Sequence, residues 1–222
     1  MRLLTLVSLI FFVTVTAAQE FRVPGIDDNR ANKWDFSFNI LSTESDTLSG
    51  QNGSGLDIKS ETGWGFGIGY NLNAHLALGF DFSYVEPSYT ATVVYEDEPT
   101  QTISHKMTIS TGQFKGLWNF VDGPLTPYAG LGLGWTYLDS NVASSPPVTG
   151  CWWDPFWGYI CRTFADTYSD TSLSYGGEVG VRWEVTPRFF LRGSYNLLRI
   201  DVSGSSDDIN LNSWRIDIGT SY

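Results

Sequence analysis

The sequence TPYAGLGLGWTYL, residues 126–138, alternates large apolar side chains with glycine and threonine along most of its length. Residues 63–73, GWGFGIGYNLN, repeat the pattern, with a bulky side chain at every second position from Trp64 to Tyr70. Successive side chains of a β-strand point to opposite faces, so a period of two predicts strands. Both stretches therefore predict strands with one bulky apolar face and one face of very small residues.

Six further segments alternate, the one near 103–120 less regularly than the others. This gives eight predicted strands: near 33–42, 60–71, 75–86, 103–120, 127–139, 172–185, 188–200 and 211–222. Short connections follow the second, fourth and sixth strands, and long polar connections follow the others: 42–61, 86–106, 139–170 and 199–210. Alternating short turns and long loops are typical of an outer-membrane barrel, whose short turns face the periplasm. The predicted fold class is all-β, an eight-stranded antiparallel up-and-down transmembrane β-barrel.

A soluble β-sandwich or a lipocalin-like barrel is the alternative, because both are also built from alternating strands. Those folds bury apolar side chains and expose polar ones. An eight-stranded membrane barrel does the opposite, with a narrow polar interior and an apolar face toward lipid. Here one face gathers nearly all of the large apolar residues and the other carries glycine, serine and charge, which favours the membrane barrel.

The two quoted strands, the alternation of connection lengths and the terminal aromatic Tyr222 resemble the small eight-stranded outer-membrane barrels of OmpA, OmpX and OmpW type. The resemblance covers roughly residues 33–222. It implies the architecture more strongly than an activity, because that superfamily includes adhesins, passive pores and stabilising surface proteins. The partners it implies are outer-membrane lipid, lipopolysaccharide, and the periplasmic chaperones and barrel-assembly machinery during biogenesis. We expect a monomer.

The N-terminus predicts export. Met1 and Arg2 precede a run of apolar residues that ends at the small pair Ala17-Ala18, the arrangement of a secretory signal peptide. The apolar run is too short for a membrane-spanning helix. We therefore predict a signal peptide over residues 1–18, a short periplasmic segment over 19–32, a barrel domain over 33–222 and an outer-membrane location.

The charge balance is acidic, with 24 acids against 13 bases and a net charge of −11. A nucleic-acid binder needs a basic face, so we expect no nucleic-acid partner. The four long connections hold 15 acids and 4 bases, so the whole excess falls in the predicted outer loops. We interpret these loops as solvated; bridging of divalent cations to lipid phosphates is the functional alternative.

The inward face of the predicted strands also carries charge. Residues at similar heights can meet across a closed barrel, and unpaired charges there are costly, so we expect one ion-pair network. The glycines of residues 63–69 are expected to face Glu178 and Arg182 across the lumen and to give them room. The network is either a structural plug or a gated ion pathway, and its predicted members are Asp35, Asp81, Lys115, Glu178, Arg182, Arg192, Arg215 and Asp217.

Both cysteines, Cys151 and Cys161, lie in the long connection after the fifth strand. An exported chain with an even cysteine count favours a disulfide. Exposed aromatic clusters often mark binding surfaces, but these rings could also pack together or rest in the lipid headgroup zone. The candidate surface-binding loop comprises Trp152, Trp153, Phe156, Trp157 and Tyr159.

We predict no enzyme, cofactor or metal site. His75 falls at a short periplasmic turn, and His105 adjoins Ser104, whose side chain should point to the opposite face of the strand. Serine-hydrolase and zinc-protease motifs are missing from the sequence. Three hypotheses remain: a plugged barrel acting structurally or in surface interaction, a narrow passive channel for small or apolar solutes, and an outer-leaflet lipid-modifying enzyme.

Overall fold

The computed structural model describes residues 30–49, 54–93, 100–201 and 209–222, so the predicted signal peptide lies outside the described residues. Every regular element in these ranges is a β-strand. In this part of the chain, no helix is long and apolar enough to cross a membrane.

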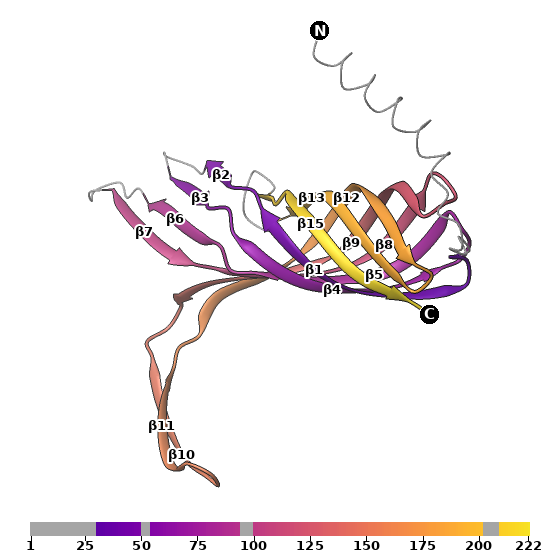
Figure 1. Ribbon diagram of the computed structural model, residues 1–222. Helices are drawn as coiled ribbons and strands as arrows, with labels where there is room; N and C mark the ends of the chain where they lie inside the picture. The colour runs from indigo at the N-terminus through magenta and orange to yellow at the C-terminus, as the bar shows by residue number, and fades with distance from the viewer. Residues whose placement is uncertain (1–29, 50–53, 94–99, 202–208) are drawn as a thin grey trace.

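Eight strands close into an antiparallel barrel, which confirms the predicted fold class (Figure 1). Each strand pairs with its neighbour along the barrel order, and pairing of the sixth with the seventh barrel strand closes the ring. The last strand also pairs with the first, and Tyr222 N donates to Trp34 O at 2.9 Å. The barrel strands are β1 (Lys33–Thr43), β4 (Thr62–Asn71), β5 (Leu76–Val85), β8 (Thr108–Asn119), β9 (Leu125–Ala143), β12 (Thr167–Thr186), β13 (Phe189–Asp201) and β15 (Ser213–Ser221).

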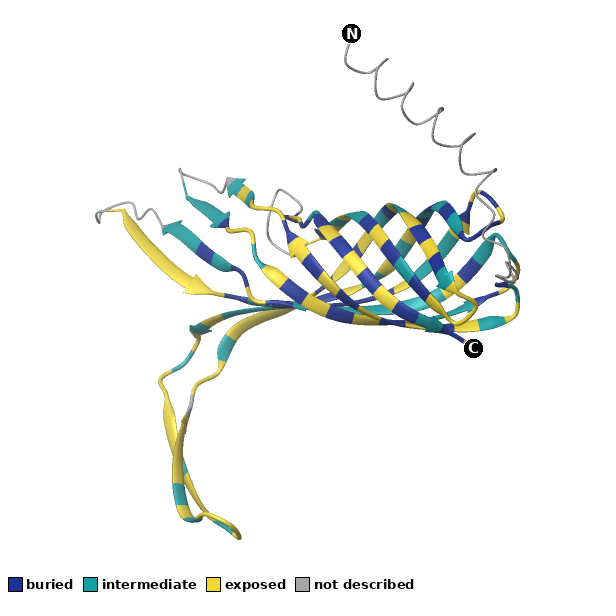
Figure 2. Cartoon of the chain, in the orientation of Figure 1, coloured by how far each residue is buried: buried dark blue, intermediate teal, exposed yellow. Residues whose placement is uncertain are grey.

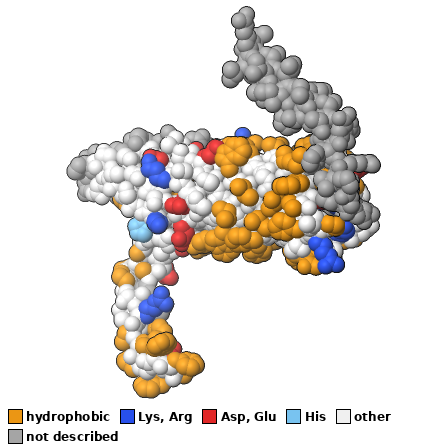
Figure 3. All heavy atoms as spheres, in the orientation of Figure 1, with side chains coloured by type: hydrophobic (Ala, Val, Ile, Leu, Met, Phe, Trp, Pro, Cys, Tyr) orange, Lys and Arg blue, Asp and Glu red, His pale blue; other side chains and the backbone are white. Residues whose placement is uncertain are grey.

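The two faces of the wall follow the predicted alternation. Figure 2 shows buried and exposed residues alternating along the barrel strands, and β1 alternates at almost every position. The exposed positions are the bulky ones: Leu131 is 76% exposed and Ile216 is 64% exposed, although both lie in the middle of the wall. In the space-filling view, apolar side chains form a band across the visible face of the barrel (Figure 3). Such a band is the lipid-facing surface of a membrane barrel.

Aromatic rings mark both ends of this band. Near the outer end, Trp64 and Tyr84 have ring centroids 5.8 Å apart on neighbouring strands. Near the periplasmic end, Trp34 and Tyr70 have ring centroids 5.1 Å apart. Girdles of aromatic residues at the two interfaces are a general feature of outer-membrane barrels.

The prediction of one continuous fourth strand over residues 103–120 was wrong. It is two strands in two sheets, β7 (Gln101–Lys106) in an outer sheet and β8 in the barrel. The chain changes sheet at Met107, whose side chain is buried and whose N–H donates to Pro87 O at 3.0 Å. The alternation is irregular here: the apolar side chains fall on odd numbers at Ile103, Met107 and Ile109, and on even numbers at Phe114, Trp118 and Phe120. This irregularity was the available signal that the segment is not one strand.

The long connections contain regular β-structure, whereas we had interpreted them as solvated loops. The first two form a four-stranded sheet beyond the barrel, in the order β2 (Asp46–Ser49), β3 (Gly55–Ile58), β6 (Ser88–Val93) and β7. The fourth contributes β14 (Ile209–Asn210), which pairs antiparallel with the outer end of β13. Parts of the acidic loops lie outside the described residues, including Glu96, Asp97, Glu98, Asp207 and Asp208.

An apolar cluster lies at the outer mouth, between this sheet and the barrel. Its members come from the sheet, from the outer ends of the barrel strands and from the segments that join them: Ile58, Val85, Tyr89, Met107, Ile109, Ile200, Ile209 and Leu211. Burial of these side chains stabilises the outer sheet against the mouth.

The face assignment predicts the effect of a charge on the barrel wall. Leu131→Arg should lower the free energy of unfolding in bilayers by about 2–4 kcal/mol, because a charged side chain near the bilayer midplane is placed in hydrocarbon. Ile103→Arg is the matched control: Ile103 is also exposed, at 41%, but lies on β7 beyond the barrel. Urea titrations of the two variants in phospholipid vesicles measure the difference, and equal stabilities would show that Leu131 does not face lipid.

Candidate functional site

The lumen holds an upper cluster of six charged side chains from five barrel strands. Asp81 lies at its centre: both carboxylate oxygens accept hydrogen bonds from Arg215, at 2.9 and 3.1 Å. Lys115 Nζ lies 2.9 Å from Asp81 Oδ2 and donates to Glu178 Oε2 at 2.6 Å. These contacts join opposite parts of the wall through long side chains.

The upper cluster continues to Arg192 and Asp217. Arg215 Nε donates to Asp217 at 3.0 Å, and Arg192 Nη2 donates to the same carboxylate at 3.2 Å. Arg192 Nη2 also donates to Ser37 Oγ at 3.2 Å. Asp217 is 1% exposed, so the two guanidinium groups provide the compensation that a buried carboxylate needs.

A lower cluster closes the periplasmic end. Arg182 donates to both oxygens of Asp35 and, through Nε, to Glu184 Oε1 at 3.2 Å. Glu184 also pairs with Arg30 Nε at 3.0 Å, and Arg30 Nη2 donates to the carbonyl of Gly123 at 2.6 Å. Arg30 comes from the segment before the first strand and is 2% exposed, so this segment fills the barrel base.

The ion pairs in the described part of the lumen thus form two groups where we had expected one network. The upper group has three acids and three bases; the lower group has two of each, so both are charge-balanced. The Phe190 ring joins them, with its centroid 4.1 Å from Arg182 Cζ and 5.2 Å from Arg192 Cζ. A cation near the face of an aromatic ring is attracted by its quadrupole. Gly219 makes room for this ring, because a Cβ there would come within 2.2 Å of it.

Arg30 and Glu184 were not among the lumen residues predicted from the sequence. Alternation places Glu184 on the same inward face as Arg182, which left one inward carboxylate without a partner. That imbalance was the available signal for a further base. Arg30 itself carries no signal, because it lies outside any alternating segment.

The glycines of β4 have a different role from the one we expected. A Cβ at Gly67 would come within 2.3 Å of Asp81 Oδ1, and one at Gly65 within 2.8 Å of Asn39 Oδ1. Gly67 therefore makes room for a side chain of the adjacent strand, not for Glu178 across the lumen. Glu178 is accommodated by its own neighbour Gly130, where a Cβ would lie 3.1 Å from Glu178 Cγ.

Two small cavities remain in the lumen. The outer one has a volume of about 50 Å³, and its lining includes Asn39 and Gln113; the inner one has about 30 Å³, and its lining includes Asp35 and Ser37. Asp81 and Lys115 line both. A cavity needs at least roughly 10–15 Å³ to hold one water, so each has room for only a few water molecules.

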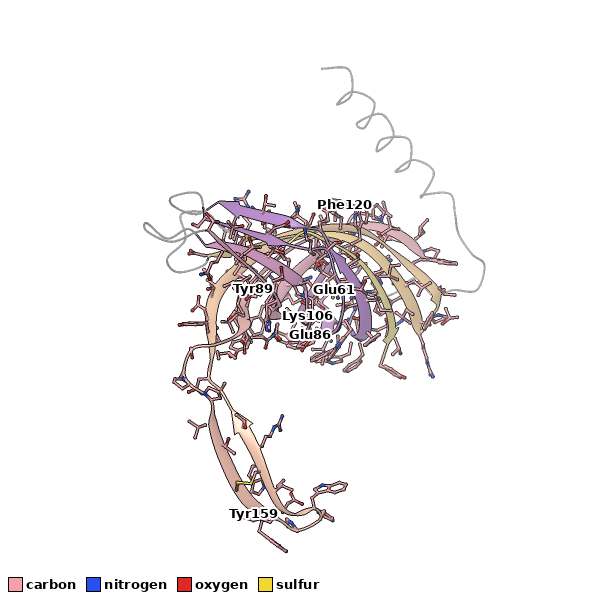
Figure 4. The ribbon with its side chains drawn as sticks, turned by 90° about the vertical axis from the view of Figure 1, so that its left-hand side faces the viewer. Glu61, Glu86, Tyr89, Lys106, Phe120 and Tyr159 are labelled. Atoms are coloured by element: carbon pink, nitrogen blue, oxygen red, sulfur yellow. A yellow bond between two sulfur atoms is a disulfide. The ribbon has the colours of Figure 1, made fainter. Side chains whose placement is uncertain are left out.

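The third long connection forms a separate hairpin, β10 (Val148–Asp154) with β11 (Gly158–Phe164). Cys151 and Cys161 are directly opposite in this ladder and are bridged, which confirms the predicted disulfide (Figure 4). Asp154 Oδ1 accepts hydrogen bonds from the N–H groups of Phe156 and Trp157 at the turn. The five residues of the predicted surface-binding loop lie at this tip, and all are exposed: Trp152 41%, Trp153 73%, Phe156 89%, Trp157 80% and Tyr159 68%.

The two histidines lie apart. The His75 ring stacks on Trp118 at a periplasmic turn, 3.7 Å from Asp122 Oδ1. His105 is exposed on β7, whereas its neighbour Ser104 contacts Thr90 Oγ1 at 3.2 Å across the ladder. Among the described residues, no group of three or more His, Cys, Asp or Glu side chains is arranged to hold a metal ion.

Residues 3–221 match the sequence model of a family described as "Outer membrane protein beta-barrel domain". A comparison with curated proteins finds no significant match.

Solved outer-membrane proteins share the fold. OprG from Pseudomonas aeruginosa is similar with a TM-score of 0.56 and 13% identity, over 86% of this chain and 96% of that chain. Neisserial surface protein A has a TM-score of 0.50 and 16% identity, over 85% and 95%. Ail of Yersinia pestis, in complex with the heparin analogue sucrose octasulfate, has a TM-score of 0.50 and 16% identity, over 86% and 99%. At these identities the likeness shows the fold alone.

The lower cluster predicts a strong coupling between Arg182 and Asp35. Arg182→Met should cost about 3–5 kcal/mol of stability, because it leaves a buried carboxylate without its counter-charge. The double variant Arg182→Met/Asp35→Asn should recover most of that loss, since Arg30 and Glu184 still balance each other. Urea unfolding of both variants in vesicles measures the coupling; equal losses in the two would contradict the pairing.

The disulfide predicts a local effect of reduction. Both cysteines lie in one outer hairpin, so the barrel should fold and insert without the bridge. Reduction should raise protease cleavage between residues 140 and 170 while the heat-modifiable migration on a gel stays unchanged. Collapse of the barrel upon reduction would show instead that the hairpin supports the wall.

Proposed function

This chain belongs to the outer membrane β-barrel family and lies in the outer membrane, and from this premise we propose that it is a non-conducting barrel that presents folded β-structure at the cell surface. The barrel is the anchor in this proposal. The outer sheet β2-β3-β6-β7 and the hairpin β10–β11 are the parts that meet the surroundings.

The observation that carries the proposal is the double closure of the lumen. A solute would have to pass the ion pairs around Asp81 and then those around Arg182. Each cluster is balanced in charge, so an ion entering it would displace a partner that already satisfies a buried charge. The wall offers no side exit among the described residues, because every pair of neighbouring barrel strands is hydrogen-bonded.

A surface role also agrees with the similar proteins. One of them is named as a surface protein and another as an attachment invasion locus protein. We carry over to this chain only the general role at the surface. Its acidic outer loops would then act as a solvated surface, with lipid, lipopolysaccharide and the assembly machinery as its other partners.

We propose no catalytic role. Among the described residues, neither histidine ring has a nucleophilic side chain as a hydrogen-bond partner. The polar contacts of the two rings run to carbonyl oxygens and to Asp122. Mass spectrometry of lipid A, with and without the protein, tests this part, and a modified lipid A would overturn it.

Planar-bilayer recordings test the closed lumen. The wild type should give no steady channels, because both ionic clusters occlude it. A charge-balanced variant, Asp81→Ser/Arg215→Ser/Asp35→Ser/Arg182→Ser, shortens four occluding side chains and should conduct more than the wild type. Gel migration before and after heating checks that the variant is folded. Large, steady channels in the wild type would replace this proposal with a narrow passive channel.

A further inference from the structure

The hairpin β10–β11 exposes more aromatic surface than a solvated loop needs. Four of its rings are more than two-thirds exposed: Trp153, Phe156, Trp157 and Tyr159. They occupy both the strands and the turn, and the disulfide holds the two strands in register beside them. Exposed apolar clusters of this kind mark contact with another apolar or interfacial phase.

The aromatic residues are present on both faces of the hairpin. Trp153 pairs with Tyr159 on the face that carries the disulfide, and Trp152 pairs with Ile160 on the other face. A protein partner docking on one flat face would leave the second face exposed. Immersion of the tip in an interfacial layer covers both faces at once.

The direction of the hairpin is fixed by an elbow, Asp139, Ser140 and Asn141, at the outer end of β9. Asn141 has a φ of 55°, in the left-handed region, and its N–H donates to Asp139 Oδ1 at 2.8 Å. Thr167 Oγ1 donates to Asp139 Oδ2 at 2.9 Å. Partial burial raises the pKa of Asp139, but these hydrogen bonds outweigh burial and hold that pKa below its ordinary value.

The elbow is also tied to the outer sheet. Asn141 Nδ2 donates to Lys106 O at 2.9 Å, and the Tyr89 hydroxyl donates to Ser140 O at 3.1 Å. Tyr89 belongs to the apolar cluster at the mouth. The hairpin therefore leaves the barrel from an anchored point, and it runs across the barrel axis instead of continuing along it (Figure 1).

A hairpin that runs across the axis at the outer end of a membrane barrel lies along the membrane surface. Its tip shows apolar side chains in the same view as the lipid-facing band of the barrel (Figure 3). Tryptophan and tyrosine are the residues that favour the headgroup level of a bilayer. The strands and turn of the hairpin carry one acid and one base, and the other acids of this connection, Asp139, Asp166 and Asp170, lie on its flanks. The part that carries the aromatic rings is therefore not repelled by lipid phosphates.

We propose that the hairpin rests on the outer leaflet of the membrane that holds its own barrel, with the aromatic tip among the lipid headgroups. The lipid surface is then a second binding partner beside the hydrocarbon around the wall. The inference does not depend on whether the lumen conducts, so its failure and that of the closed barrel are distinguishable.

Tryptophan fluorescence tests the proposal. The chain has nine tryptophans, and the variant Trp152→Phe/Trp153→Phe/Trp157→Phe retains the six on the barrel wall as an internal reference. Subtracting the emission spectrum of this variant from that of the wild type gives the emission of the three hairpin tryptophans. In phosphatidylcholine vesicles brominated near the headgroup, the hairpin emission should be blue-shifted relative to tryptophan in water. The brominated lipid should quench a fraction of the hairpin emission comparable with the fraction that it quenches for the six wall tryptophans. Aqueous iodide should quench the hairpin emission little.

A change at the elbow provides the second measurement. Asp139→Ala, made with and without the three Trp→Phe changes, removes the side chain that holds the bend. It should reduce quenching by the brominated lipid and increase quenching by iodide. Asp170→Ala on the neighbouring β12 is the matched control and should leave both unchanged. Gel migration checks that each barrel is folded.

The opposite result overturns the inference. Hairpin emission that iodide quenches strongly and brominated lipid does not, in the wild type, would leave the aromatic tip in solvent as a site for a protein partner. This wild-type measurement decides the question even where an elbow variant fails to fold.

Discussion

An eight-stranded barrel encloses a space that its own side chains must fill, and this constraint governs the rest of the structure. A narrow interior puts every inward charge close to others in a medium where an unpaired charge is expensive. Asp81, Arg215 and their neighbours satisfy this condition as a neutral group, and Arg30 completes the second group at the base. The narrow interior also limits the volume of the inward side chains. Gly67 and Gly219 meet this steric limit, because each leaves the space that a neighbouring side chain occupies.

The inward face changes its chemistry at the outer end of the barrel. On β5, Asp81, Ser83 and Val85 share the inward face, yet the chemistry changes from a carboxylate to a buried valine within four residues. Below this point the wall is apolar outside and polar inside. Above it, Ile58 and Ile109 pack inward as in a soluble core, and the outer sheet carries hydroxyl groups such as those of Thr90 and Ser104 on its other face. One chain thus obeys opposite burial rules in two solvents.

The alternation of the sequence could predict which face of the wall a residue lies on. It could not predict which side chains meet between neighbouring strands, because those contacts depend on the register of the strands. A period of two fixed the faces of Leu131 and Asp217, and the cysteine count favoured the bridge. Which side chain a glycine accommodates depends on the stagger of neighbouring strands, so Gly67 was assigned to the wrong partner. The base plug by Arg30 arises from contacts with distant segments, for which no local pattern exists. The change of sheet at Met107 left only the irregular alternation of residues 103–120 as a trace.

The distribution of charge separates the three environments of the chain. The lumen clusters are neutral because a low-dielectric interior does not tolerate a surplus. The strands and turn of the hairpin are neutral as well, with Asp154 and Arg162 as their charged residues. The excess of −11 therefore falls in the segments that meet water, among them the loops with Glu61 and Glu86. Since the lumen and the hairpin each balance separately, the acidic surplus is a property of the water-exposed surface alone and can vary without disturbing the wall, the plug or the aromatic tip.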